Sequence, residues 1–175
     1  MNVTTVKKPI YLCGFMGCGK TTVGRILAKM LGCQFTDLDA FIEKRAGMTI
    51  PEIFKTHGEA HFRKLEAEAL VSFPQKCAVI ATGGGALVSE ENGAAVLARG
   101  IPILVDTPFA LCYVRIQGDK NRPLAAATRE ELLARYDARR PFYEKHSLGK
   151  VSGTGTSIET ANEVLALVAA LTPNP

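Results

Sequence analysis

A glycine-rich motif near the amino terminus constrains the fold of this chain more than any other feature. Residues 14–21 read Gly-Phe-Met-Gly-Cys-Gly-Lys-Thr, which satisfies the pattern G-x-x-x-x-G-K-S/T. The motif follows the apolar run Pro9–Cys13 and precedes a segment whose apolar residues recur at helical spacing. A strand that feeds a glycine turn and a helix directs backbone N–H groups and the positive helix end at one point, where phosphate groups can bind. The sequence therefore predicts a nucleoside triphosphate site, because an incidental lysine in a glycine turn does not account for the flanking strand and helix.

Each kind of residue in the motif has a physical role in binding phosphate. Gly17 and Gly19 allow the backbone to turn tightly and to approach the ligand closely. Lys20 can reach the β- and γ-phosphates, and the hydroxyl of Thr21 can ligate Mg²⁺. Cys18 lies near the expected helix N-terminus, where a thiol can become reactive toward alkylating reagents; the alternative is a small apolar filler.

Length and composition indicate one domain, residues 1–175, that buries most of its unfolded surface without disulfides. The five cysteines are an odd number and form no C-x-x-C pair, which favours a reduced, cytoplasmic setting. The first eight residues lack the apolar stretch of a signal peptide, and no run of 18 apolar residues occurs. We therefore expect a cytoplasmic protein with no membrane partner.

The positive charge of the chain is concentrated in one segment. The formal net charge is +4, and residues 115–150 hold nine basic and five acidic side chains, an excess equal to that of the whole chain. A nucleic-acid surface would combine such charge with interleaved aromatic residues, but this segment has few, and much of it has mixed charge at helical spacing. We therefore expect small anionic ligands rather than nucleic acid as its partners.

Apolar runs alternate with helical patterns along the chain, which predicts an α/β domain with a mainly parallel sheet. Strands are expected at residues 9–13, 33–36, 77–81, 101–105 and 148–151. Helices are expected at residues 20–31, 38–46, 50–57, 59–73, 89–99, 108–117, 129–145 and 157–171. Ligands of such sheets bind beyond the carboxyl ends of the strands, so polar motifs that follow strands are candidate site residues.

Two aspartates, Asp37 and Asp39, follow the second expected strand. In an extended segment, residues two apart point the same way, so both carboxylates would face the nucleotide. One could hold the metal, directly or through water, and the other could accept a proton from a substrate hydroxyl. Either aspartate could instead cap the following helix, although capping needs only one of them.

Three successive glycines, Gly83–Gly85, follow the third expected strand. Each glycine loses much conformational entropy on folding, so the three suit a place where the backbone must come against a ligand. The alternative is a flexible loop, because glycine clusters also mark ordinary loops.

Arg63 has Glu59 four residues before it and Glu66 three residues after it in a helical segment. It could form only surface ion pairs with them. If Glu66 instead holds Arg63 toward the cleft, the planar guanidinium suits a substrate carboxylate. His57 and His61 are also four apart, but they form H-x-E-x-H rather than H-E-x-x-H and have no evident third ligand, so we expect no zinc there.

A polar stretch, residues 117–124, contains glycine and proline between two expected helices. It is typical of a mobile lid, here about residues 117–127, that closes over a nucleotide. Arg122 within it could neutralise charge that develops on the transferred phosphoryl group. It could also be a solvated loop arginine, because exposed arginine is common.

Together these motifs resemble the shikimate kinase family, small ATP-dependent kinases of aromatic amino acid biosynthesis. The resemblance runs from about residue 9 to residue 165. It rests on the phosphate loop with Val23-Gly24-Arg25, on Asp37–Asp39, Ile42–Phe54, Gly58–Glu66, Thr82–Ala86, Arg122–Leu124 and Arg139–Tyr143. The family implies a three-layer α/β/α fold with a five-stranded parallel sheet, of the P-loop, nucleoside-monophosphate-kinase-like type. It also implies transfer of the ATP γ-phosphate to the 3-hydroxyl of shikimate, and we expect a monomer with a shikimate-binding region at about residues 38–66.

On the nucleotide side, the resemblance implies that residues 17–22 wrap the ATP phosphates. These residues are Gly17, Cys18, Gly19, Lys20, Thr21 and Thr22. Thr21, with Asp37 through water, would hold Mg²⁺, and Arg122 would close on ATP from the lid. Arg115 would lie against adenine. Thr156 is at best a backbone contact, because residues 152–156 lack the long polar side chain that family members often carry near adenine.

On the substrate side, the resemblance implies that Asp39 contacts a ring hydroxyl and accepts the proton of the 3-hydroxyl. Arg63 and Arg139 would clamp the shikimate carboxylate, with Gly84 at the ring. A second arginine, Arg140, directly follows Arg139. The spacing to the next Pro-Phe-Tyr favours Arg139 for the carboxylate and leaves Arg140 as a surface charge.

Two other functions share parts of this pattern. A gluconate kinase would share the nucleotide half, and it would be favoured if Arg63 and Arg139 pointed away from the cleft. A nucleotide-dependent switch or nucleic-acid ATPase would use the basic segment 115–150. The chain contains no N-K-x-D motif for reading guanine, which argues against a GTP switch.

Overall fold

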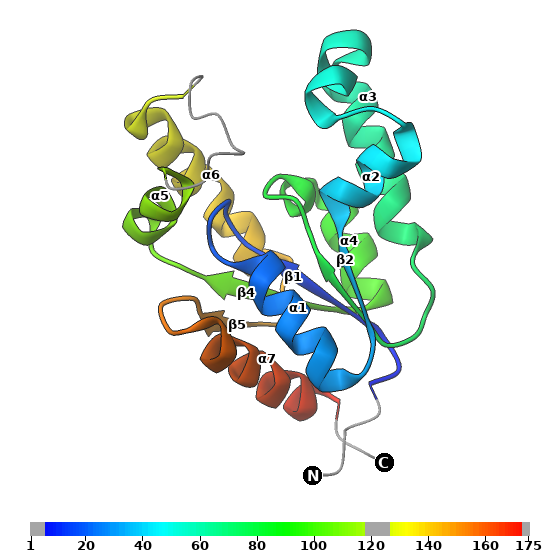
Figure 1. Cartoon of the computed structure of the whole chain (residues 1–175), viewed down its shortest axis with the longest axis vertical. Helices are drawn as coiled ribbons and strands as arrows, with labels where there is room; N and C mark the ends of the chain where they lie inside the picture. The colour runs from blue at the N-terminus through cyan, green and yellow to red at the C-terminus, as the bar shows by residue number, and fades with distance from the viewer. Residues whose placement is uncertain (1–5, 118–126, 173–175) are drawn as a thin grey trace.

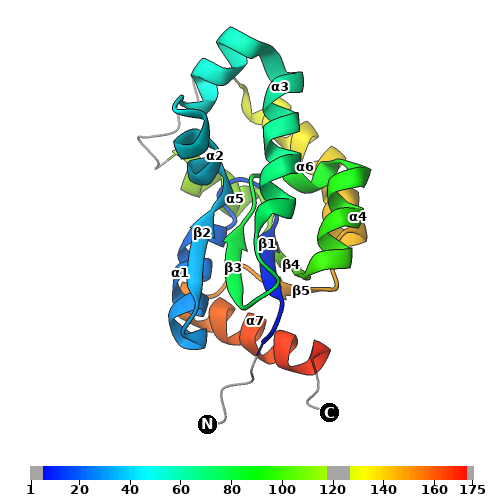
Figure 2. The same ribbon diagram turned by 90° about the vertical axis from the view of Figure 1, so that its right-hand side faces the viewer.

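The computed structural model describes residues 6–117 and 127–172, which fold around one sheet of parallel strands (Figure 2). The strand order is β2-β3-β1-β4-β5. The strands are β1 (Pro9–Cys13), β2 (Gln34–Asp37), β3 (Ala78–Ala81), β4 (Ile101–Asp106) and β5 (Gly149–Ser152). This confirms the predicted five-stranded parallel sheet, and each strand lies within one residue of the range expected from the sequence.

Helices cover both faces of the sheet, which gives the expected three layers (Figure 1). The helices are α1 (Lys20–Leu31), α2 (Leu38–Ala46), α3 (Ile50–Ser72), α4 (Glu90–Arg99), α5 (Phe109–Gln117), α6 (Arg129–Lys145) and α7 (Ser157–Leu171). α1 and α7 lie on one face, and α3 and α4 lie on the other, while α2 and α5 rise beyond the carboxyl ends of the strands. Strands β1 and β3 are buried along their whole length, because both of their faces are covered.

Local capping signals fix where the helices begin and end. Gly32 and Gly47 follow α1 and α2 in the left-handed region, with φ of 63° and 67°, where glycine is favoured. Thr49, Thr128 and Thr156 each begin a helix with a capping box to the glutamate three residues later.

Gly58 divides α3 into the two helices that the sequence predicts there. Its φ of 82° and ψ of 170° are not helical, and they fall in a region that only glycine adopts readily. The sequence did not predict the short 3-10 helix η1 (Ala86–Val88) that follows the glycine turn.

The strand order places the site at the centre of the sheet. The chain leaves β1 toward β2 and β3 on one side and crosses back to β4 on the other. Ligands of open α/β sheets bind beyond the carboxyl ends at such a switch point, and the phosphate loop follows β1 there. Within the two described ranges, no helix is long and apolar enough to span a bilayer.

Candidate active site

The phosphate loop joins β1 to α1 in a backbone conformation that requires glycine. Gly14, Gly17 and Gly19 have φ of 139°, 79° and 102°. A Cβ added at Gly14 would lie 2.8 Å from Val105 O, and one at Gly17 would lie 2.7 Å from Cys112 O. Backbone neighbours of this kind cannot yield easily, so Gly14 and Gly17 have room for hydrogen only.

The side chains of Lys20 and Cys18 pack against the inner side of the loop to which both residues belong. The Lys20 ammonium donates hydrogen bonds to Gly14 O (2.8 Å) and Phe15 O (3.0 Å), and it lies 3.5 Å from Cys18 Sγ. The Cys18 side chain is 2% exposed. That burial favours the small apolar filler over the reactive thiol, and it leaves only the Cys18 backbone for contact with phosphate.

Asp37 serves as a helix cap and also meets the phosphate loop. Its Oδ1 accepts hydrogen bonds from the backbone N–H groups of Asp39 (3.2 Å) and Ala40 (3.4 Å) at the start of α2. Its Oδ2 accepts a hydrogen bond from Thr21 Oγ1 (2.9 Å). Capping and metal binding were alternatives for Asp37 in the sequence, but its two oxygens have separate partners, so one carboxylate can do both.

Asp39 is half-buried in the first turn of α2 and is not in an extended segment. The expectation that period-two spacing aligns it with Asp37 was wrong, because β2 ends at Asp37 and the helix begins at Leu38. Asp39 still faces the site: a Cβ added at Gly83 would lie 2.7 Å from Asp39 Oδ1. The helical turn, rather than strand pleating, directs its carboxylate to the glycine turn.

The glycine turn Gly83–Gly85 meets a different charged side chain at each position. Gly83 faces Asp39, while a Cβ at Gly84 would lie 3.6 Å from Arg139 Nη1 and one at Gly85 would lie 2.8 Å from Arg63 Nη1. A flexible loop was the alternative for this turn. The short distances at Gly83 and Gly85 instead indicate a turn packed against charged side chains, whereas Gly84 makes an ordinary van der Waals contact.

Glu66 is the buried charge at the centre of this arrangement. It is 1% exposed, and its Oε2 accepts a hydrogen bond from Arg63 Nη1 at 2.9 Å. Burial raises the pKa of Glu66; the hydrogen bond and charge of Arg63 oppose this, Asp39 raises the pKa further and Arg139 lowers it. Glu66 therefore lies among the three candidate substrate residues and orients Arg63 from behind.

Arg63 is held from both sides on α3. Glu66 and, at 3.3 Å, Glu59 accept its hydrogen bonds, and its side chain is 35% exposed. Burial lowers the pKa of Arg63, but the hydrogen bonds and charges of the two glutamates outweigh it, so the net pKa is raised. The surface-pair alternative thus accounts for Glu59, whereas Glu66 turns the guanidinium toward the glycine turn.

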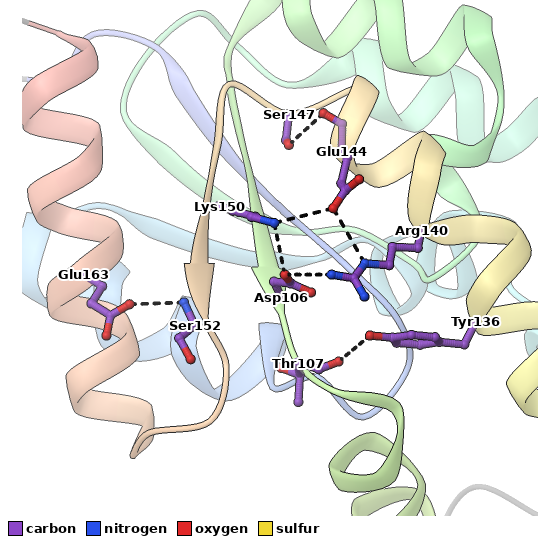
Figure 3. A network of polar contacts seen from close by, with 9 residues as sticks. All are labelled: Asp106, Thr107, Tyr136, Arg140, Glu144, Ser147, Lys150, Ser152 and Glu163. Atoms are coloured by element: carbon purple, nitrogen blue, oxygen red, sulfur yellow. Dashed lines mark hydrogen bonds and ion pairs between the residues drawn. The ribbon is translucent and has the colours of Figure 1, made fainter.

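The two adjacent arginines of α6 point to different places. Arg139 lies against Gly84, and Tyr143 one turn later donates a hydrogen bond to Gly84 O. Arg140 instead reaches Asp106 (3.4 Å) and Glu144 (3.6 Å) in a surface network with Lys150 (Figure 3). The sequence-based choice of Arg139 agrees with this division.

A cavity of about 260 Å³ connects the phosphate loop to the glycine turn. Its lining includes the loop residues Gly17, Gly19, Lys20, Thr21 and Thr22 together with Asp37, Asp39, Gly83, Gly84 and Arg115. A smaller cavity adjoins it between Cys18, Thr22, Arg115, the loop residues Gly153 and Gly155, and Ser157 at the start of α7. The candidate residues of the phosphate loop, Asp37, Asp39, Gly84 and Arg115 therefore border one continuous region. Arg63 and Arg139 line neither cavity and instead lie beside the first one, against the glycine turn.

Arg115 and Thr156 differ in how they meet the second cavity. Arg115 donates hydrogen bonds to Gly17 O (3.3 Å), Cys18 O (3.4 Å) and Gly153 O (3.2 Å), so it bridges the phosphate loop and the last loop. The hydroxyl and N–H of Thr156 both bond to Glu159. A nucleotide contact by Thr156 stays a prediction, and Arg122 with residues 118–126 of the lid lies outside the described residues.

His57 and His61 lie with ring centroids 4.7 Å apart on α3. Within residues 6–117 and 127–172, no group of three or more histidine, cysteine or acidic side chains could hold a metal ion. The histidine pair therefore gives no support for zinc.

Comparison with known proteins identifies the family. The family model described as shikimate kinase matches residues 16–169, which is most of the chain. The chain belongs to the shikimate kinase family. A shikimate kinase of Aquifex aeolicus (strain VF5) is 40% identical over 157 residues, covering 89% of this chain and 93% of that protein. A shikimate kinase of Geobacter sulfurreducens is 40% identical over 162 residues, with 91% and 89% covered.

Solved structures of family members match the fold closely. A shikimate kinase from Acinetobacter baumannii in complex with shikimate has a TM-score of 0.86 at 38% identity and covers 95% of this chain and 96% of its own. The shikimate kinase structure from Aquifex aeolicus has a TM-score of 0.80 at 38% identity, with 93% and 97% covered. A gluconokinase from Sinorhizobium meliloti has a TM-score of 0.60 at 14% identity, which indicates a shared fold alone.

Proposed function

We propose that this chain transfers the γ-phosphate of ATP to the 3-hydroxyl of shikimate, giving shikimate 3-phosphate and ADP. One observation carries this assignment: Asp39, Arg63 and Arg139 come from three elements to the glycine turn beside the phosphate loop. This combination suits a hydroxylated carboxylic acid, since arginines bind its carboxylate and an acid engages its hydroxyl.

The nucleotide would bind along the two adjoining cavities. Backbone N–H groups of residues 17–22 would surround the phosphates, because they lie at the start of α1 where its dipole favours anions. Lys20 would leave its carbonyl partners in the loop to meet the phosphates. Arg115 already bridges the loop and Gly153, and this supports its place beside the adenine. Contacts from Arg122 and the Thr156 backbone belong to the same proposal.

Thr21 and Asp37 would hold Mg²⁺, Asp37 through water. The pair fits, because hydroxyl and carboxylate oxygens suit a hard cation and they already lie 2.9 Å apart at the loop. Bound with ATP, Mg²⁺ would offset the negative charge of the β- and γ-phosphates.

Catalysis would rest on positioning and charge, because phosphoryl transfer needs little covalent help from the protein. Arg63 and Arg139 would hold the shikimate carboxylate, with Gly84 under the ring, so that the 3-hydroxyl faces the phosphate loop. Asp39 would orient that hydroxyl and accept its proton. Lys20 and Arg122 would stabilise the charge on the transferred group.

The broader biological setting is part of the proposal. We infer a cytoplasmic monomer, with ATP and shikimate as its partners and neither nucleic acid nor membrane among them. The proposed single domain comprises the phosphate loop 14–21, a shikimate-binding region at about 38–66 and a lid at about 117–127.

The direct test is ADP release by the purified protein with ATP, Mg²⁺ and either shikimate or gluconate. We expect stimulation by shikimate. Mass spectrometry of the product should show the addition of one phosphate, and NMR spectroscopy should place it on the 3-hydroxyl. Stimulation by gluconate with none by shikimate would assign the chain to the alternative kinase. Heat-inactivated protein supplies the control for ATP hydrolysis without enzyme.

A further inference from the structure

Two half-buried cysteines lie side by side at the amino ends of β2 and β3, far from the phosphate loop. These strands pair in parallel with Gln34 opposite Ala78, and Cys33 and Cys77 each precede those residues by one position. Residues at matching positions of paired parallel strands point to the same face. Neighbouring strands are about 4.8 Å apart, which is within the Cα separation that a disulfide spans.

The two thiols are close enough to influence each other's protonation. Burial, a hydrogen bond with Cys77 and the charge of Cys77 together raise the pKa of Cys33 to about 12. The Cys33 thiol therefore stays protonated near neutral pH, which leaves Cys77 as the sulfur that meets an oxidant first. No other pair of cysteines within the described ranges lies at matching positions of neighbouring strands.

The pair is also accessible to small reagents. Both cysteines line a shallow cavity with Leu31, Gly32, Gln34 and Lys76. The other three cysteines, Cys13, Cys18 and Cys112, are buried in the core. An oxidant can therefore reach Cys33 and Cys77 without unfolding the protein, whereas it cannot reach the others.

The backbone on each side of the pair is fixed by a turn. The N–H of Cys33 donates to Ala28 O at 3.0 Å, after the left-handed Gly32 that ends α1. On the other strand, the N–H of Lys76 donates to Pro74 O at 2.8 Å. Formation of a disulfide would therefore restrict the backbone of the folded chain little further at these two positions.

We propose that Cys33 and Cys77 are a redox modification site, which hydroperoxides convert to a reversible disulfide between the amino ends of β2 and β3. The Cys77 sulfur attacks one oxygen of hydrogen peroxide and the O–O bond breaks. Cys77 becomes a sulfenic acid, and the other oxygen departs as water. The Cys33 sulfur then attacks the Cys77 sulfur, and its proton leaves with the hydroxyl as a second water. Two thiols lose two electrons and two protons to the peroxide, and a dithiol reductant returns them.

The test uses the reduced full-length protein, treated with hydrogen peroxide, alkylated and digested with trypsin without reductant. Lysines 44 and 76 lie between the two cysteines, so trypsin separates them. We expect a cross-linked pair of peptides holding Cys33 and Cys77, lighter by two hydrogens than their sum and separated by dithiothreitol. The oxidised protein should also melt roughly 5–10 °C higher than the reduced one, because the bond closes a long loop of the unfolded chain.

Cys33→Ser and Cys77→Ser supply the controls. Each variant keeps only one thiol of the pair, so it should show neither the cross-link nor the rise in Tm. Peptides of the three buried cysteines are internal controls and should become alkylated only after denaturation. Sulfinic acid on Cys77 without a cross-link, or a disulfide through another cysteine, would overturn the proposal. The wild-type measurement stands even if a serine variant fails to fold.

Discussion

Neighbouring residues of the same type have different surroundings in this protein, as Arg139 and Arg140 show. Both lie on α6, but a helix turns by about 100° per residue, so one faces the glycine turn and the other faces solvent. Arg139 meets Gly84, whereas Arg140 joins the surface network of Asp106, Glu144 and Lys150 (Figure 3). Function at this scale depends on which face of the helix carries the charge.

The two arginines form a matched experiment. Arg139→Ala should raise the KM for shikimate roughly 10–100-fold, because it removes a charge-assisted hydrogen bond to the carboxylate, while the KM for ATP stays nearly unchanged. Arg140→Ala should change either KM less than about threefold and stability by at most about 1 kcal/mol, as exposed ion pairs do. Steady-state kinetics of both variants checks this, and an equal loss of ATP and shikimate binding in Arg139→Ala would point to a structural role.

Glu66 should make stability depend on pH in a defined direction. Its pKa in the fold is raised above the ordinary 4.5 by burial, so the folded state binds the proton more readily than the unfolded state. Its contribution to stability is therefore fully present below pH 4.5 and is lost as the pH rises through the folded pKa. The free energy of unfolding of the wild type, relative to Glu66→Gln, should fall as the pH rises from about 4.5.

Urea unfolding of both proteins across that pH range measures the difference. Because the amide does not titrate, all other groups cancel to first order in the comparison. The difference in the free energy of unfolding could instead stay flat, or grow in favour of the wild type as the pH rises. Either result would show that Arg63, rather than burial, has the larger effect on the pKa of Glu66.

At the scale of elements, the division of α3 depends on one backbone conformation. Gly58 directs the chain from the first half of the helix into the half that carries Arg63 and Glu66. A Cβ there would meet nothing within 4 Å, so any cost of substitution comes from φ of 82° and ψ of 170° alone. Gly47 also has open space around it, but it adopts the milder left-handed conformation with φ of 67° and ψ of 19°.

Gly58→Ala should destabilise the protein by about 2–3 kcal/mol, and Gly47→Ala by about 1 kcal/mol. Gly58→Ala should also raise the KM for shikimate, because a change in backbone direction at residue 58 moves the second half of α3, which carries Arg63. Chemical denaturation and kinetics of the two variants decide this. Equal destabilisation of the two variants would mean that the conformation at Gly58 relaxes without cost.

α6 is the element that joins the substrate side to the body of the molecule. From one face it places Arg139 and Tyr143 on Gly84, and His146 at its end contacts Leu87 O at 2.7 Å. The glycine turn and η1 are therefore held from a helix more than 50 residues later in the chain.

For the whole molecule, ligand binding and folding are linked because the nucleotide site exists only in the folded state. ADP with Mg²⁺ at a hundred times its Kd should stabilise the fold by about 2.7 kcal/mol, which corresponds to a rise in Tm of roughly 5–10 °C. Differential scanning fluorimetry measures the shift.

Lys20→Met is the control for that shift. It keeps most of the side-chain volume but removes the ammonium, so the ligand-dependent shift should largely disappear even though the variant itself melts lower. A shift that persists undiminished in Lys20→Met would contradict the placement of the phosphates at this loop.

Local signals predicted much of the fold. The apolar runs and helical spacings placed the helix and strand boundaries to within about two residues, because those boundaries depend on neighbours in the chain. The error at Asp39 has the same origin: the period-two argument holds only while the strand continues, and the cap at Asp37 ends it. The helix η1 lacks a periodic pattern long enough to be recognised.

The amino-acid sequence by itself determined the phosphate loop, the α/β class and the residue types that the site uses, since each is written in short motifs. Only the tertiary structure decided how Asp39, Arg63 and Arg139 meet at one glycine turn, why Glu66 is buried among them, and that Cys33 lies beside Cys77. These contacts join residues far apart in the chain, and they are set by strand order and helix packing. Sequence periodicity reports which face of an element is buried, but it does not report which other element covers that face.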